Sequence, residues 1–401
     1  MSDRVIVAGA GPVGAAAAVA LGLRGVSVLL VEQETDLPAD PRAATLQPPT
    51  LEMLDDLGVG GAIHARGLAA PRFQFRDRAS DDVIAVFDYG RLAGETPHPF
   101  AVQCEQFKVA SALVERARAL PNVEVRLGTR LEGFDQDEEG VIARIAGPGG
   151  AETVGAAFLI GCDGGRSGVR KTLGVAFEGF TYPERFLVLT TRFDFATLGY
   201  EVRNYCLDPE RWCALFKVPH EGPPGLWRCV FPTPGDAPDE AVLSDEAVDA
   251  TIRTLKAPLT AADVVHRNLY KVNQRVAASF AEGRVLLAGD AAHVNNPLGG
   301  LGMNSGIHDA LNAADKIAAA LAEPARRTAL LGAYDAERRA LAEEYVQAQT
   351  IQNKKRLEAK DDEARARNME ELRASAADPD RHRAWVMRAS LIEGLRKREA
   401  A

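Results

Sequence analysis

A glycine-rich stretch near the N-terminus has the residue types and spacing that bind a dinucleotide. In VIVAGAGPVG, three glycines form a Gly-x-Gly-x-x-Gly pattern between an apolar run and an Ala-rich segment. Such glycines permit a tight turn, the approach of a pyrophosphate and close packing of a helix on a strand. An acid at the end of the next apolar run is placed to accept from ribose hydroxyls and disfavours a 2′-phosphate. The sequence therefore predicts a nucleotide site made of Gly9, Gly11, Pro12, Val13, Gly14 and Glu32.

A second glycine-rich stretch, GDAAHVNNPLGGLGMNSG, covers residues 289–306. Its Asp290 ends another apolar run, and Pro297 and several glycines precede a long Ala-rich segment. A backbone with few side chains lets a large ligand lie against peptide groups, and a helix N-terminus favours an anion. A purely structural interpretation is also open, in which the stretch is a tight loop and Asp290 caps it.

The first glycine motif alone does not separate NAD from FAD. The second stretch resembles the flavin-binding signature of the single-component, FAD-dependent aromatic hydroxylases related to p-hydroxybenzoate hydroxylase. The resemblance implies that Asp290 holds the ribityl chain of FAD, and that main-chain N–H groups of the following loop and helix start line the flavin ring. The loop residues implied are Pro297, Gly299, Gly300, Leu301, Gly302, Met303 and Asn304.

Three further segments are similar to the same family. In GCDGGRSGVR, Asp163 is implied to be associated with both the flavin and NAD(P)H. In DPRAATLQPPTLEMLDDLGV, Arg42 is implied to approach the flavin, and in QCEQF, at an expected helix start, Gln103 is implied to reach the cofactor. The structural alternatives are a salt bridge from Asp163 to Arg166 or Arg170, a surface salt bridge for Arg42 and a helix-end role for Gln103.

The substrate side is indicated by NYCLDPERW, which resembles a hairpin of the family's sheet. There a tyrosine four residues before the turn proline contacts the substrate phenol, which implies that Tyr205 is a catalytic and substrate-contacting residue. We expect Tyr205 to face the flavin ring across a pocket. The other substrate residues expected are Pro297 and Leu298 as its floor, Trp212 and Phe216 as its walls, and Gln47 where some members have a histidine. Core packing is the alternative for Trp212 and Phe216, and a half-exposed position in the sheet is the alternative for Tyr205. A hydrogen-bonded structural role is expected for His293.

The resemblance implies a monooxygenase that hydroxylates a small electron-rich aromatic compound of the phenol, aminobenzoate or hydroxypyridine type. NADH or NADPH would reduce non-covalently bound FAD, and O₂ would form a flavin C4a-hydroperoxide that transfers one oxygen. Since the chain has one nucleotide-binding glycine motif, NAD(P)H is expected to bind transiently, with reduction waiting for substrate. The alternatives are a flavin-dependent reductase or dehydrogenase without oxygen insertion, and a flavin-bound redox sensor or partner-binding module.

The elements that position these residues follow from the apolar pattern. Continuous apolar runs predict strands at 5–8, 26–31, 123–127, 156–165 and 284–290, and Ala-rich segments predict helices at 12–24 and 304–322. This alternation predicts an α/β fold with a Rossmann-like, doubly wound parallel sheet. Aromatic and β-branched residues predict an interleaved antiparallel sheet over 181–232, with strands added from 70–90. The charged segment after Pro324 predicts an exposed C-terminal helix, available for contacts in a homodimer.

These elements predict three parts of the chain. The FAD-binding domain is discontinuous and comprises residues 1–70, 98–180 and 265–330. The substrate-binding β-sheet domain comprises 71–97 and 181–264, and the C-terminal helical segment comprises 331–401.

Composition narrows the protein class. The 401 residues carry a net charge of −9, which argues against a nucleic-acid binder. Five cysteines without paired spacing indicate reduced thiols and a cytoplasmic protein, and no His/Cys cluster has metal-ligand spacing, so no metal is expected. The apolar N-terminal stretch is broken by glycines, Pro12 and Arg24, so a strand, helix and strand are expected there rather than a membrane span.

Overall fold

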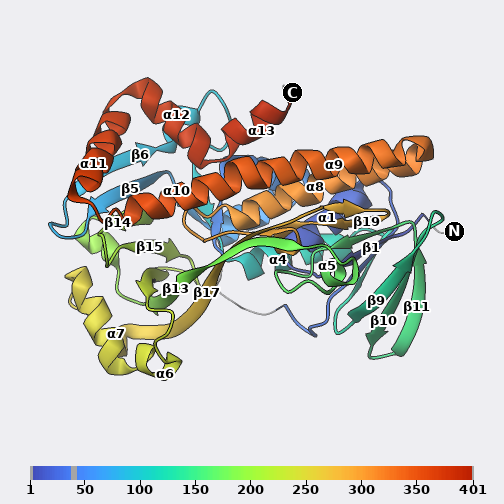
Figure 1. Cartoon of the computed structure of the whole chain (residues 1–401), viewed down its shortest axis with the longest axis horizontal. Helices are drawn as coiled ribbons and strands as arrows, with labels where there is room; N and C mark the ends of the chain where they lie inside the picture. The colour runs from blue at the N-terminus through green and yellow to red at the C-terminus, as the bar shows by residue number, and fades with distance from the viewer. Residues whose placement is uncertain (1–2, 38–42, 400–401) are drawn as a thin grey trace.

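The computed structural model describes residues 3–37 and 43–399, and its first layer is a six-stranded sheet (Figure 1). The strand order is β18-β19-β12-β1-β2-β8, parallel throughout except for the β18–β19 pair. The strands are β1 (Val5–Ala8), β2 (Val28–Val31), β8 (Val123–Arg126), β12 (Phe158–Gly161), β18 (Ala281–Glu282) and β19 (Val285–Leu287). Every residue of β1, β2, β12 and β19 is buried, which explains their continuous apolar runs.

Helices cover this sheet, and two of them carry the glycine-rich stretches. Helix α1 (Pro12–Leu23) follows β1 and packs against α4 (Gln106–Arg118) and α8 (Gly302–Ala322). Because α1 is pressed from several sides, its residues from Gly14 to Gly22 are all buried, and alanine permits the close approach. Helix α9 (Arg327–Leu341) lies along α8 (Figure 1). The predicted parallel sheet and both Ala-rich helices are confirmed.

Two small sheets and two short helices were not predicted. An antiparallel sheet of β9 (Arg130–Gln136), β10 (Val141–Gly147) and β11 (Gly150–Ala156) connects β8 to β12. In β10 buried Val141, Ala143 and Ile145 alternate with exposed neighbours, and one of those neighbours is the apolar Ile142, which blurs the pattern. The second sheet joins β3 (Thr45–Leu46), β7 (Ala101–Gln103) and β4 (Leu68–Ala70), with α2 (Pro48–Asp56) and α3 (Gly60–Arg66) between them.

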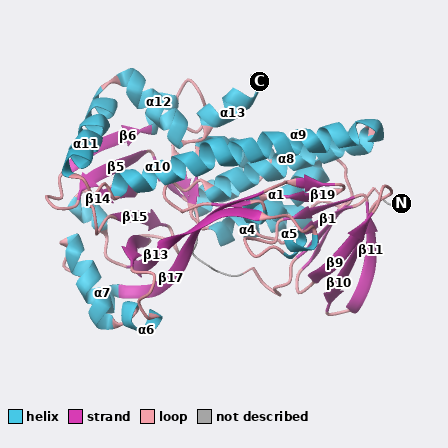
Figure 2. Ribbon diagram, viewed as in Figure 1, coloured by secondary structure: helices cyan, strands magenta, loops and turns pink. Residues whose placement is uncertain are grey.

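An eight-stranded, largely antiparallel sheet forms the second layer (Figure 2), as expected, and its order is β20-β17-β13-β16-β15-β14-β5-β6. The strands are β5 (Arg72–Asp77), β6 (Val83–Asp88), β13 (Phe177–Thr191), β14 (Arg203–Leu207), β15 (Cys213–Val218), β16 (Leu226–Thr233), β17 (Val264–Ala277) and β20 (His293–Val294). Only β14 and β5 pair in parallel. Strand β17 begins at Val264 and pairs along β13, so residues 265–277 lie in this sheet. The division of the chain into domains stays a prediction.

The C-terminal segment corrects one expectation. Instead of one exposed helix, it forms α10 (Ala348–Leu357), α11 (Asp362–Ala377), α12 (Pro379–Ala389) and α13 (Ile392–Glu399). Helices α11 and α12 lie beside β6, and α13 lies next to α12 (Figure 1). Leu372 and Val386 are fully buried, and the Trp385 ring stacks on Phe87 at 4.7 Å between centroids. The helices are short and each contributes few apolar residues, so no wide apolar face is visible in the sequence. A homodimer stays a prediction.

The remaining helices are α5 (Gly168–Thr172), α6 (Asp239–Val242) and α7 (Asp245–Ile252). All five cysteines are free thiols. Within residues 3–37 and 43–399, none of the helices has the length and apolarity needed to traverse a lipid bilayer.

Candidate active site

The three glycines after β1 have different surroundings. Gly9 has a φ of +102°, and a Cβ there would lie 2.5 Å from the carbonyl oxygen of Cys162. A Cβ on Gly14 would lie 1.9 Å from the carbonyl oxygen of Gly9, so this glycine permits helix α1 to sit close to the turn. A Cβ on Gly11 would meet nothing within 4 Å. Gly11 therefore borders open space, which is where a pyrophosphate would approach.

Glu32 lies beside this turn at the end of β2. Its carboxylate accepts the backbone N–H of Ala10 at 2.8 Å and that of Glu34 at 3.1 Å. These bonds fix the carboxylate at the carboxyl edge of the sheet, next to the glycine turn. This is the position from which an acid can reach a ribose.

The two glycine-rich stretches meet at Val13. A Cβ on Gly289 or on Gly306 would lie 2.8 Å or 2.6 Å from the Val13 side chain. Strands β1, β12 and β19 are neighbours, so the stretches that follow them all open at the same edge of the sheet. In doubly wound folds this edge is where ligands bind.

Asp163 follows β12 and caps a short helix. Its Oδ2 accepts the backbone N–H groups of Gly168 at 2.7 Å and Val169 at 3.0 Å. Arg170 donates to the carbonyl oxygens of Ala291 and Gly165, so it is engaged with backbone rather than with Asp163. The second carboxylate oxygen of Asp163 is buried and has no partner among the described residues.

Asp290 is exposed in a 3₁₀ turn, Gly289–Ala291. A hydrogen bond to Asp309 of α8 fixes this turn. Asp309 Oδ2 accepts the N–H of Gly289 at 3.0 Å and lies 2.8 Å from Nε2 of His293, while Arg338 donates to Oδ1 at 2.6 Å. Burial acts to raise the pKa of Asp309, but Arg338 and His293 outweigh it and hold this pKa below the ordinary value. His293 thus has the hydrogen-bonded structural role expected of it.

The loop before α8 is built around Asn304. Its buried side chain accepts the N–H of Gln47 at 2.7 Å and donates to the carbonyl oxygens of Thr45 at 2.8 Å and Gly300 at 2.6 Å. Helix α8 begins at Gly302 and has no side-chain cap, so the N–H groups of Gly302 and Met303 point out of its first turn. Gly299 and Gly300 have φ values of +112° and +67°, which glycine adopts without strain.

Gln103 ends strand β7, and α4 begins at Gln106 with Glu105 as its N-cap, so the helix start expected in QCEQF is confirmed. The Nε2 of Gln103 donates to the Thr45 hydroxyl at 2.9 Å, and the Oε1 of Gln103 is buried with no partner among the described residues. Arg42 lies outside the described residues.

These features fit an extended dinucleotide. The open space at Gly11 and the unpartnered oxygen of Asp163 follow the neighbouring strands β1 and β12. The unpartnered oxygen of Gln103 and the uncapped start of α8 come together at Thr45, to which both Gln103 and Asn304 are hydrogen-bonded. Buried polar atoms without partners are uncommon in native proteins, so a ligand that pairs with them is expected. The donors and acceptors match FAD, which offers a pyrophosphate, hydroxyls and a ring with both hydrogen-bond donors and acceptors.

A small cavity of about 30 Å³ lies between the loop before α8, the eight-stranded sheet and the C-terminal helices. This is room for about two water molecules. From the sheet it is lined by Phe73, Phe75, Arg203 and Tyr205, from the loop by Gly299 and Leu301, and from α10 and α12 by residues that include Trp385. Tyr205 is 5% exposed and stacks on Phe75 at 5.3 Å between centroids.

The other expected substrate residues lie around this cavity rather than on its wall. Pro297 is exposed, and buried Leu298 packs in the same apolar cluster as Tyr205. Trp212 packs edge-on against Phe186 at 5.0 Å, and Phe216 contacts the Tyr205 ring at 5.8 Å. Gln47 is buried, and its Nε2 donates to the carbonyl of Gly299 at 3.3 Å.

Arg203 and Tyr89 belong to the same site but were not predicted. Arg203 donates to the hydroxyls of Tyr89 at 2.6 Å and Tyr205 at 3.3 Å, and Tyr89 donates to Oε1 of Gln47 at 3.0 Å. One sequence signal could have found Arg203: residues two apart on a strand share a face, so Arg203 and Tyr205 had to lie side by side. Tyr89 is 114 residues from Arg203 and gives no comparable signal.

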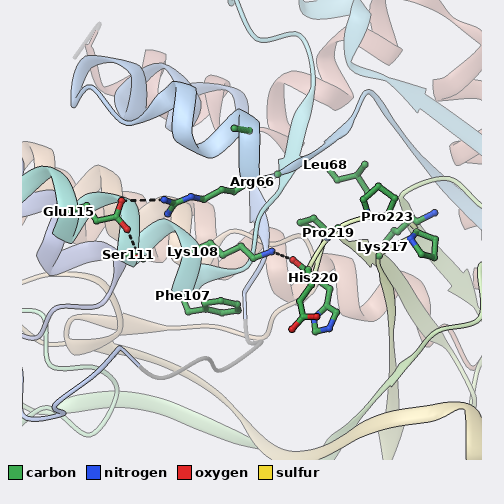
Figure 3. Close-up of a pocket in the computed structure, with 16 residues that line it drawn as sticks. Arg66, Leu68, Phe107, Lys108, Ser111, Glu115, Lys217, Pro219, His220 and Pro223 are labelled. Carbon is green, nitrogen blue, oxygen red and sulfur yellow. Dashed lines mark hydrogen bonds and ion pairs between the residues drawn. The ribbon is translucent and has the colours of Figure 1, made fainter.

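A larger pocket of about 910 Å³ lies between α3, α4 and the loop from β15 to β16 (Figure 3). Its cations already have acidic partners: Arg66 pairs with Glu115, Lys108 with Glu105, and Lys217 with Asp194. Lys108 also donates to the carbonyl oxygen of His220, across the pocket (Figure 3). These cations are therefore poorly disposed to bind a phosphate group.

The fold also gathers Asp55, His64 and His98 at the surface, with their ligand atoms within 4.8 Å of one another. His98 Nε2 lies 2.5 Å from Asp55 Oδ2, and the His64 and His98 rings are 5.2 Å apart. The spacing of these residues along the chain gave no indication of this cluster.

Comparisons with known proteins agree with this geometry. A family model described as an FAD binding domain matches residues 3–349. The chain is 33% identical over 401 residues to para-nitrophenol 4-monooxygenase of Pseudomonas sp. (strain WBC-3), covering 98% of this chain and 97% of that protein. It is 32% identical over 358 residues to 6-hydroxy-3-succinoylpyridine 3-monooxygenase of Pseudomonas putida (strain DSM 28022 / S16), covering 89% of each.

A solved structure is similarly close in fold. The crystal structure of p-nitrophenol 4-monooxygenase from Pseudomonas putida DLL-E4 superposes with a TM-score of 0.91 at 32% identity, covering 97% of this chain and 98% of that one. The chain belongs to the FAD-binding family of flavin-dependent aromatic monooxygenases.

Proposed function

We propose that this FAD-dependent aromatic monooxygenase oxygenates a small phenol or hydroxypyridine at the ring carbon para to the hydroxyl group. Two relatives support the proposal, one named for p-nitrophenol and position 4, the other for 6-hydroxy-3-succinoylpyridine and position 3. In both names the reacting position lies para to a hydroxyl and bears an electron-withdrawing group. A hydroxyl oxygen feeds electron density into the para carbon, as transfer of an electrophilic oxygen requires.

The observation that carries the proposal is the cavity beside Gly299. Its walls are aromatic, from Phe73, Phe75 and Trp385, and hydroxyl-binding groups from Arg203 and Tyr205 also line it. Apolar walls with a few placed polar groups are typical of sites that orient a small aromatic ligand. At about 30 Å³ the cavity is too small for an aromatic ring, so entry of substrate requires movement of the loop or of the C-terminal helices.

The chain's own residues would divide the work between the two sheets. Around the six-stranded sheet, Gly11 would admit the pyrophosphate of FAD, Glu32 would bind a ribose, and Asp290 would bind the ribityl chain. The loop before α8 and Gln103 would bind the edge of the flavin ring. From the eight-stranded sheet, Tyr205 would contact the substrate hydroxyl. When bound, FAD supplies electrons from a reduced nicotinamide cofactor and activates O₂.

The test measures oxygen uptake and oxidation of NADH and NADPH by the holoenzyme with a panel of phenols, aminobenzoates and hydroxypyridines, followed by identification of the products. We expect uptake coupled to a product oxygenated para to the hydroxyl. Oxidation of NAD(P)H without oxygen in the product for every compound would support a reductase instead, and a flavin inert to NAD(P)H would support a redox sensor. The relatives do not favour either alternative.

A further inference from the structure

Arg203 is a buried cation whose hydrogen-bond partners among the described residues are all uncharged. It is 3% exposed, and it donates to the hydroxyls of Tyr89 at 2.6 Å and Tyr205 at 3.3 Å and to the carbonyl oxygen of Gly299 at 3.4 Å. Its Nε is buried and has no acceptor in the part of the chain that the structure describes. The guanidinium therefore keeps donor capacity unused at the wall of the cavity.

Arg203 differs from Arg338, which has an acidic partner, and from the equally buried Arg170, which has only carbonyl acceptors but does not line this cavity. Arg338 is equally buried, at 4% exposure, and meets the carboxylate of Asp309 at 2.6 Å. A buried charge without a counter-charge is costly, and buried charges are normally paired. A cation that keeps its charge without an acid at a cavity wall is expected to receive an anion there.

No acidic side chain contacts Arg203 among the described residues, so none competes with an anion bound there. Tyr89 and Tyr205 are the titratable groups that contact it, and the residues facing the cavity from α10 and α12 carry no formal charge. The nearby cations of α10 are engaged elsewhere: Lys354 pairs with Glu184 and Glu358, and Arg356 lies over the Trp385 ring at 4.6 Å.

The charge on Arg203 is retained in this environment. Burial opposes the charged form, but the oxygen atoms of Tyr89 and Tyr205 outweigh it and raise the pKa of Arg203 above its ordinary value. Burial in turn raises the pKa of Tyr89, although Arg203 acts against this shift, so the tyrosine stays a neutral hydroxyl at physiological pH. The guanidinium therefore brings a positive charge to the wall of the cavity.

We propose that Arg203 is the oxyanion-binding residue of the substrate pocket and that the enzyme binds its phenol or hydroxypyridine as the deprotonated anion. This rests on the proposed function, whose site it specifies further. On ionisation the O–H bond of the substrate breaks and its proton goes to water, while the bonds to carbon are unchanged. The anionic oxygen then accepts a hydrogen bond from the guanidinium in place of one of its present neutral acceptors, the tyrosine hydroxyls or the Gly299 carbonyl. Electron-withdrawing para substituents make phenols more acidic, so substrates of this kind are readily available as anions near neutral pH.

The sharpest probe is 4-nitrophenol, because its anion and its neutral form differ in visible absorption. Difference spectra of the holoenzyme would be recorded over a pH series that extends below the pKa of the free phenol. 4-Nitroanisole, which has no ionisable hydroxyl, serves as the matched ligand. The variants are Arg203→Gln, Arg203→Lys and, as a control, Arg72→Gln, which removes an exposed arginine of β5 that pairs with Glu201.

In the wild type and the control we expect bound 4-nitrophenol to be anionic below the pKa of the free phenol. Arg203→Gln should bind it in the neutral form and lose affinity for the anion by about ten- to a hundredfold, the range of a charge-assisted hydrogen bond. Arg203→Lys should still bind the anion, although more weakly, and affinity for 4-nitroanisole should change little in either variant.

Three results would overturn the proposal: neutral 4-nitrophenol in the wild-type site, no binding of it at all, or an unchanged anion affinity in Arg203→Gln. The wild-type spectrum decides the matter even if Arg203→Gln does not fold. Failure of the proposed function is a different result, since it would show bound phenolate without any oxygenated product in the turnover assay.

Discussion

The carboxylate of Asp309, in the interior of α8, accepts the backbone N–H of Gly289 at 3.0 Å. Gly289 directly precedes Asp290, so a side chain far along the sequence fixes the turn that presents the expected ribityl-binding acid. Asp309 is fully buried, its Oδ1 forms an ion pair with Arg338 at 2.6 Å, and its Oδ2 lies 2.8 Å from Nε2 of His293. The cofactor turn and the interior of the helix are therefore one structural unit.

Removing Arg338 should destabilise this unit strongly. Arg338→Met leaves the buried charge of Asp309 without its main partner, which should lower the free energy of unfolding by about 3–5 kcal/mol. Urea denaturation of the FAD-saturated protein measures this. The matched control is Arg339→Met, which removes a partly exposed arginine that pairs with Asp335 and Glu343 and should cost at most about 1 kcal/mol. An equal decrease in the free energy of unfolding in the two variants would show that the buried ion pair stabilises the fold no more than the exposed one.

Two substitutions in the glycine turn after β1 should affect different properties, one the affinity for FAD and the other the stability of the fold. In Gly11→Ala the new methyl group meets open space within the protein, so stability without FAD should be unchanged while FAD affinity falls. In Gly14→Ala the methyl group would overlap the carbonyl of Gly9, so the fold itself should lose stability. Thermal unfolding of the apoprotein and FAD titration by fluorescence measure the two effects. Unchanged FAD affinity in Gly11→Ala would place the pyrophosphate elsewhere.

Asp290 should contribute to retention of the cofactor. The purified protein is expected to be yellow and to release unmodified FAD on denaturation, and Asp290→Ala should contain less of it. Asp315→Ala is a suitable control, because it removes an exposed acid of α8 that pairs with Arg24. A flavin content in Asp290→Ala equal to that of the control would remove Asp290 from the site.

His308 should make the fold sensitive to mild acid. Burial, with Arg338 acting in the same direction, lowers the pKa of His308 from 6.5 to about 3, so the folded protein keeps it neutral. Below about pH 6.5, His308 becomes protonated in the unfolded chain but stays neutral in the folded protein. The contribution of neutral His308 to the free energy of unfolding is therefore fully present above about pH 6.5. It decreases as the pH falls toward 3, by up to about 1.4 kcal/mol per pH unit.

Unfolding free energies measured between about pH 6 and pH 4 test this linkage. His308→Gln should show a shallower dependence on pH than the wild type, whatever its absolute stability. His64→Gln, at an exposed histidine, should keep the wild-type slope. Identical slopes for all three proteins would mean that the His308 ring is protonated in the folded state.

The sequence predicts well those elements whose residue types are set by a single requirement, such as burial on both faces or an unusual backbone conformation. Strands β1, β2, β12 and β19 are buried on both faces and so appear as unbroken apolar runs. Both cofactor loops contain glycines that backbone geometry favours, such as Gly9 and Gly299 with their positive φ. Strand β10 was missed because one face is exposed and still carries Ile142, which is 47% exposed. The C-terminal helices were misjudged because each buries few side chains, such as Leu372 and Val386.

The substrate side could be predicted only in part. Tyr205 was found through a resemblance, whereas Arg203 looks like an ordinary solvent-exposed cation in a strand. Its burial depends on Tyr89 and Gly299, which reach it from elsewhere in the chain. Trp385 lines the cavity from a helix with little apolar pattern. Properties that arise from several distant segments leave no local periodicity to detect.

Substrate should control reduction of the flavin through Gly299. Both Arg203 and Gln47 donate to the carbonyl oxygen of Gly299, at 3.4 Å and 3.3 Å, and so hold the loop that is expected to line the flavin ring. A phenolate on Arg203 would compete with this carbonyl and loosen the loop. A reduced flavin that meets O₂ without substrate would waste its electrons as peroxide, so such a gate has a chemical purpose.

Anaerobic stopped-flow reduction by NADH or NADPH, with and without the best phenol of the panel, measures the gate. We expect the phenol to accelerate reduction at least several-fold in the wild type and in Arg72→Gln. In Arg203→Gln the acceleration should largely disappear even at phenol concentrations that saturate the variant, because the guanidinium no longer links the ligand to Gly299. Equal rates with and without phenol in the wild type would refute the gate and indicate that the loop responds to neither ligand nor Arg203.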